Sequence, residues 1–145
     1  MIDLMMELKT ADPNVYFLTS AQIRESVDWL ADAIGKLDGV LDHFDSSRNR
    51  THEFPLIFMS FDLASAWTSL NMCRIHTEHI LYLEELIQPA MGFIVDAKSM
   101  CDHLAAKSME MTISAFYSIV GCLQNALEAI HMVTDELLSW LVPGQ

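Results

Sequence analysis

The chain has 145 residues, of which 52% are hydrophobic and 19% are charged. Twenty acidic against eight basic residues give a formal net charge of −12, which repels nucleic-acid backbones and anionic membrane surfaces. This composition excludes a disordered chain, and five Gly and four Pro leave few interruptions of regular structure. We therefore expect one helical domain, residues 1–145, with neither a nucleic-acid nor a membrane partner.

The N-terminal arm, residues 1–18, mixes apolar and polar positions and is not expected to form a long element. Its start contains two acidic residues and lacks the basic region and cleavage site of a signal peptide. Three cysteines, Cys73, Cys101 and Cys122, form no CxxC pair and leave an odd one over, which suits buried thiols in a reducing compartment. These features favour a cytoplasmic location.

A first long helix is predicted over residues 19–45. Thr19 and Gln22 have the spacing of a capping box, in which each side chain accepts from the backbone N–H of the other residue. Behind them, apolar residues recur at steps of four and three, which indicates one face of a helix: Ile23, Val27, Leu30, Ile34, Leu37, Leu41 and Phe44. Ala33 and Val40 widen this apolar side and indicate contact with more than one neighbouring helix.

Two further helical segments follow. In residues 60–88 polar residues fill one narrow strip, so we expect this helix to be the most buried, and to end at Pro89 and Gly92. In residues 93–142 polar positions repeat every seven residues without a slip. This segment is either one very long helix of roughly 75 Å or two helices divided by a turn near residues 106–111.

Together these segments predict an all-α helical bundle of three to four long amphipathic helices in up-and-down order. Should residues 93–142 form a single helix, the two shorter helices would not cover all of its apolar face, and a second copy of the chain could do so. We therefore expect a homodimer. The ten methionines suit either an irregular core or a surface that adapts to apolar partners.

His76 and His79 are the first candidates for ligand-binding residues. They are spaced i, i+3 in the sequence His-Thr-Glu-His on the second predicted helix. An imidazole pair that faces a bundle core can bind a transition metal or haem, because facing helices supply the remaining ligands. In the alternative interpretation the pair is structural: each ring nitrogen meets a buried carbonyl or hydroxyl, or the pair lines an interface.

The acidic side of the first predicted helix is the second candidate site. Its aspartates either mimic the charge spacing of nucleic acid and block a basic protein, or only solvate the helix: Asp28, Asp32, Asp38 and Asp42. The sequence contains no phosphate-binding glycine loop and no nucleophile–base arrangement, so we do not expect an enzyme.

The favoured hypothesis is a macromolecular interaction protein, an adaptor, regulator or inhibitor, which binds a protein partner through its helical faces without a cofactor. A bundle that binds a metal, haem or small apolar ligand is the first alternative. An acidic nucleic-acid mimic is the second.

Overall fold

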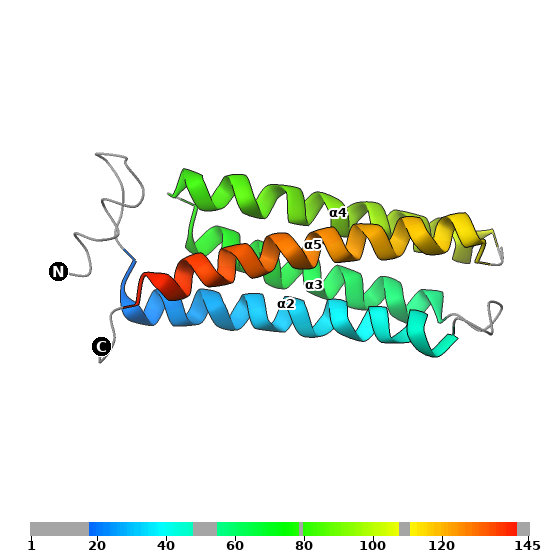
Figure 1. The fold of residues 1–145 in the computed structure, drawn as a ribbon, viewed down its shortest axis with the longest axis horizontal. Coiled ribbons are helices and arrows are strands. Elements are labelled where there is room, and N and C mark those ends of the chain that lie inside the picture. The colour runs from blue at the N-terminus through cyan, green and yellow to red at the C-terminus, as the bar shows by residue number, and fades with distance from the viewer. Residues whose placement is uncertain (1–17, 48–54, 79, 108–110, 142–145) are drawn as a thin grey trace.

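The computed structural model describes residues 18–47, 55–78, 80–107 and 111–141. Within these ranges the chain forms four α-helices: α2 (Ser20–Ser47), α3 (Leu56–His76), α4 (Leu81–Ala106) and α5 (Ile113–Ser139). The helices lie side by side along the long axis of the molecule, and each runs opposite to the one before it (Figure 1). Each helix packs against the next one in the chain, and α5 packs back against α2. The predicted all-α bundle is confirmed.

Every helix buries the side on which apolar residues recur at alternating steps of three and four. In α2 the fully buried hydrophobic positions are Ile23, Leu30, Ala33, Leu37, Val40 and Phe44. Val27, Ile34 and Leu41, which the sequence placed on the main apolar seam, are only half buried. The reason is that α2 packs against both α3 and α5. The side of α2 that faces the core therefore lies between these two neighbours and includes Ala33 and Val40.

A turn after α3 divides the predicted helix over residues 60–88, so that prediction was wrong. The Thr77 hydroxyl donates to the Cys73 carbonyl (3.0 Å), and the Ile80 N–H donates to the Thr77 carbonyl (2.9 Å). These bonds satisfy backbone groups at the end of α3 locally. Thr77 and Ile80 are each 1% exposed, which anchors the turn in the core. Neither glycine nor proline marks it in the sequence.

Helix α4 runs through Pro89, although Pro89 and Gly92 were expected to end a helix. Proline removes the bond that its N–H would make to the Glu85 carbonyl. Both residues are exposed, so water can reach the freed carbonyl. On the opposite side of the same stretch Ile87 and Ala90 are fully buried, and this packing keeps the helix continuous.

The predicted segment 93–142 is two helices, with the break where the alternative had placed a turn. Residues 107–112 separate α4 from α5. Thr112 caps α5, because its hydroxyl accepts from the Ala115 N–H (3.0 Å). The single long helix of roughly 75 Å is excluded, since α4 and α5 pack side by side.

The core positions slip by one residue between α4 and α5. Ala97, Leu104 and Met111 are buried at intervals of seven, and the next member of that series would be Ser118. Ser118 is exposed, whereas Ile119 is buried. The polar positions that repeat every seven residues lie on the outer sides of both helices. These sides are broad, so the repeat of polar residues continues although the buried positions shift by one residue.

By length and composition alone, α5 is the one helix in the described part of the chain that could cross a membrane. In the bundle, 22% of its most apolar stretch is buried. A bundle helix with an apolar inner side passes the same test, and α5 turns Ile119, Leu123, Ala126 and Ile130 into the core. The cytoplasmic location stays a prediction.

Candidate interaction surface on helix α3

His76 lies on the flank of α3 that faces α2. Its Nε2 atom is 3.4 Å from Oε1 of Glu25, and its side chain is 27% exposed. Among the described residues this nitrogen has no hydrogen-bond partner, and they contain no group of three or more metal-binding side chains. His79 lies outside the described residues. The predicted site for a metal or haem at His76 and His79 therefore stays a prediction.

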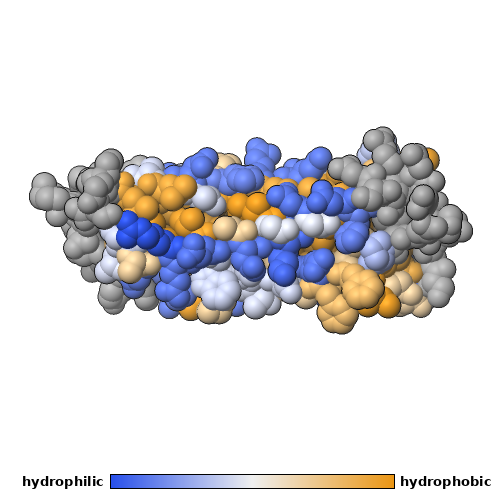
Figure 2. Space-filling model, turned by 90° about the horizontal axis from the view of Figure 1, so that it is seen from below, coloured by the Kyte–Doolittle hydropathy of each residue, from blue (hydrophilic) through white to orange (hydrophobic). Residues whose placement is uncertain are grey.

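The aspartates of the predicted acidic side are all exposed on α2: Asp28, Asp32, Asp38 and Asp42. Asp32 lies toward α3, where its carboxylate accepts a hydrogen bond from the Ser69 hydroxyl (2.5 Å). Figure 2, which views the bundle from the side of α2, shows hydrophilic side chains over most of this surface. The carboxylates are accessible to a partner and to water alike, so the mimicry hypothesis also stays a prediction.

The thiols are not arranged for nucleophilic chemistry. Cys73 and Cys101 are buried and free, and burial raises the pKa of each to about 12. Burial also raises the pKa of Cys122, which is half buried. Since the thiolate is the reactive form, burial keeps Cys73 and Cys101 in the unreactive thiol form near neutral pH. The prediction of buried thiols is confirmed for Cys73 and Cys101.

The outer side of α3 differs from the acidic outer side of α2. No charged side chain lies on it between Leu56 and His76. It consists of Ile57, Phe58, Phe61, Ala64, Ser65, Thr68, Asn71, Met72 and Ile75, which we call the α3 face. The charged residues of this helix lie on its flanks, where Arg74, for example, pairs with Glu84 of α4 (3.6 Å).

Three large apolar side chains at the start of α3 project into solvent. Phe58 is 69% exposed, Phe61 66% and Ile57 63%. Figure 2 shows apolar side chains gathered at the end of the bundle where α3 begins. The sequence had predicted that this helix is the most buried, because few of its residues are polar. Most residues of α3 are indeed buried or half buried, but the outer side of the helix stays in contact with solvent.

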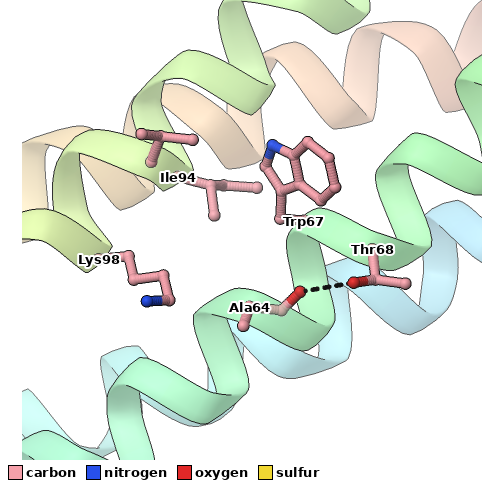
Figure 3. Close-up of a pocket in the computed structure, with 6 residues that line it drawn as sticks. Ala64, Trp67, Thr68, Ile94 and Lys98 are labelled. Atoms are coloured by element: carbon pink, nitrogen blue, oxygen red, sulfur yellow. Dashed lines mark hydrogen bonds between the residues drawn. The ribbon is translucent and has the colours of Figure 1, made fainter.

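Two hollows flank the α3 face. Between α3 and α4 lies a hollow of about 220 Å³, lined by Ala64, Trp67, Thr68, Ile94, Val95 and Lys98 (Figure 3). Between α2 and α3 lies a second one of about 440 Å³, lined by Asp32, Lys36, Phe61, Ala64, Ser65, Thr68 and Ser69. Ala64 and Thr68 line both hollows, because their small side chains leave space on either side of the helix.

The hollow between α3 and α4 has an apolar wall and a charged rim. Trp67 and Ile94 lie near each other on one side of it and Lys98 on the other (Figure 3). The Thr68 hydroxyl donates to the Ala64 carbonyl (3.0 Å), so this polar group is already satisfied. Lys98 Nζ donates to Oδ2 of Asp102 (2.7 Å), and the Ser60 hydroxyl donates to Oδ1 of the same carboxylate. These bonds, from Lys98 first and Ser60 second, lower the pKa of Asp102.

Comparison with known proteins finds no matching family model, no similar curated protein and no similar solved structure. The functional argument therefore depends on the geometry of this chain alone.

Proposed function

We propose that this chain is a macromolecular interaction protein, an adaptor, regulator or inhibitor, which binds its partner through the α3 face and has no catalytic activity of its own. The observation that supports the proposal is the exposure of Ile57, Phe58 and Phe61 on a helix whose outer side lacks charge. Contiguous exposed apolar patches on soluble proteins mark binding surfaces.

Folding of the bundle does not require apolar residues at these positions. Residues of α3 that contribute to the core point inward, and Met59, Leu63, Ala66 and Leu70 are fully buried. Phe58 and Phe61 gain little from the folded state, because about two thirds of each side chain stays in water. Aromatic residues are enriched at protein interfaces, where burial of their rings supplies binding energy.

The experiment that tests this proposal is site-specific photo-crosslinking in the cells that make the protein. A photo-reactive phenylalanine analogue replaces Phe58 on the α3 face and, in a matched control, Asp42 on the exposed side of α2. We expect macromolecular adducts from position 58 and few from position 42, with the attached molecule identified by mass spectrometry. An absence of adducts from position 58, or equal yields from both positions, would contradict the proposal.

The acidic side of α2 is the second candidate surface. Its support is that all four aspartates are accessible and that the chain has a net charge of −12. A basic partner would be attracted to this side over a distance of roughly 10 Å at moderate ionic strength. If the acidic side of α2 is the binding surface, we expect the crosslinking experiment to give adducts from position 42 and none from position 58.

A further inference from the structure

We propose that the occupant of the α3 face is the α3 face of a second copy of this chain, in an antiparallel pair related by a two-fold axis. In this pair Phe61 of each copy inserts into the hollow between α3 and α4 of the other. The inference rests on the proposed function and names its partner. Three features of the described residues support it. They are the spacing of large and small side chains along the outer side of α3, the size of the hollow relative to a phenyl ring, and the distribution of charge.

The outer ridge of α3 is complementary to itself. Ile57, Phe61, Ala64 and Thr68 follow one another at steps of four, three and four, so they lie on one side of the helix. A two-fold axis midway between Phe61 and Ala64 places Phe61 of one copy on Ala64 of the other. The same axis places Ile57 on Thr68. Large side chains therefore meet small ones at all four contacts of the symmetric interface.

The hollow beside Ala64 has the size and chemistry to receive a phenyl ring. Its volume is about 220 Å³, and an apolar cavity of roughly 150 Å³ is large enough to bind benzene. Trp67, Ile94 and Val95 supply apolar walls. Lys98 lies at the rim, where an ammonium group near the face of an aromatic ring is attracted to it.

The charge distribution favours this face over the acidic side of α2 for contact between two copies. Two chains of net charge −12 repel each other, and the outer side of α2 would add four aspartates from each copy. The α3 face adds none. In addition, Lys36 and Lys98, two of the eight basic residues, line the hollows on its two flanks, where they offset the charges of Asp32 and Asp102.

The exposed apolar side chains at the start of α3 supply about half of the area that a small dimer interface needs. Ile57, Phe58 and Phe61 leave roughly 350 Å² of apolar surface in water, on the basis of about 200 Å² for a whole aromatic side chain. A two-fold pair buries this surface twice, roughly 700 Å² in total. The lower limit of stable interfaces is about 1,200 Å², so the remaining residues of the α3 face have to supply the other part.

The first test is sedimentation velocity of the purified full chain over a range of concentrations. We expect the wild type to be a dimer and Phe61→Asp to weaken the dimer roughly 100-fold or more, because each dimer loses two buried rings. The matched control is Tyr117→Asp, which changes an equally exposed aromatic residue at the start of α5, at the same end of the bundle. This control should remain dimeric, and circular dichroism should show full helix content in both variants.

The second test examines the register through a complementary pair of variants. Phe61→Asp and Ala64→Lys are each expected to be monomeric, because each places an unpaired charge in the interface. When the two variants are mixed, one contact becomes an Asp–Lys pair and the other keeps its native Phe61 and Ala64. We therefore expect the mixture to form a dimer. Failure to form this heterodimer while the wild type is dimeric would overturn the proposed arrangement.

A monomeric wild type at all concentrations, or equal effects of Phe61→Asp and Tyr117→Asp, would also overturn the inference. The crosslinking at position 58 separates this failure from failure of the proposed function. Adducts with a different protein, together with a monomeric pure chain, would refute the dimer and leave the interaction function supported. Adducts between two copies of the chain support both.

Discussion

Helices α2 and α3 lie next to each other, bury similar inner sides and differ completely outside. Both turn apolar residues inward at steps of three and four, from Ile23 to Phe44 in α2 and from Met59 to Cys73 in α3. The outer side of α2 carries four exposed aspartates, whereas that of α3 carries no charge. Folding of the bundle depends on the inner sides only. The difference between the outer sides therefore reflects demands other than folding, and we infer that the demand on α3 is contact with a partner.

The strongest contrast is expected between the two sides of α3 itself. Leu63→Ala removes a fully buried side chain and should lower the free energy of unfolding by about 2–5 kcal/mol. Phe61→Ala changes an exposed side chain and should alter it by less than about 0.5 kcal/mol in the monomer. Urea denaturation at a protein concentration too low for association measures both. A comparable loss in the two variants would show that the outer side also contributes to folding.

The inner side of α3 also differs from that of α2 because it holds a buried thiol. Burial raises the pKa of Cys73, and that of Cys101 in α4, from 9.0 to about 12. The unfolded chain therefore loses these protons first, so the stability that they contribute is complete below pH 9 and is lost as the pH rises toward 12. We expect the denaturation midpoint to decrease as the pH rises from 9 toward 12, the range set by these pKa values.

The control for that experiment is a chain with Cys73→Ala and Cys101→Ala, compared with itself across the same pH range. Its midpoint should decline less steeply, because this chain lacks both buried thiols. Equal slopes in the two chains would show that thiol ionisation does not couple to unfolding.

The two helices also begin differently. In α2 the Thr19 N–H donates to Gln22 Oε1 (2.8 Å) and the Gln22 N–H donates to Thr19 Oγ1 (3.1 Å). Helix α3 begins after Pro55 without a side-chain cap. Thr19→Ala should therefore cost about 1 kcal/mol of stability, measured by thermal unfolding. Thr19→Ser keeps the hydroxyl and should retain most of this stability. A loss of stability as large as that of Thr19→Ala would argue against capping.

The smallest effect is expected on the acidic side of α2. Asp28→Asn combined with Asp42→Asn removes two of twenty acidic residues, so the net charge changes from −12 to −10. Both side chains are exposed, and we expect a change in stability within about 0.5 kcal/mol and no change in dimerisation. Thermal unfolding and sedimentation velocity measure these properties. Loss of a crosslinked basic partner in this variant would instead support the mimicry hypothesis.

Local patterns in the sequence predicted the features that depend on neighbouring residues. The capping box of Thr19 and Gln22 is confirmed by both of its hydrogen bonds, and α2 ends within two residues of the predicted position. The inward sides of the helices follow from apolar spacing, because a repeat of three and four residues can bury only one side of a helix.

Features that depend on tertiary packing could not be predicted in the same way. The turn at Thr77 is held by burial of Thr77 and Ile80, and no residue type marks it. The α3 face was missed because a shortage of polar residues indicates burial and an interaction surface equally well. Spacing alone does not decide which side of His76 faces the core, and the structure places it beside Glu25.

The antiparallel order of the four described helices has a consequence for how the molecule can be joined to others. The start of α2 and the end of α5 lie at one end of the bundle, and the start of α3 lies at the other (Figure 1). A helix of 28 residues, such as α2, spans roughly 40 Å. In the antiparallel pair the two copies overlap near the start of α3, so the start of α2 and the end of α5 lie at opposite tips of the pair in the two copies. The assembly would then be an elongated rod, and proteins fused to its two tips would be held far apart.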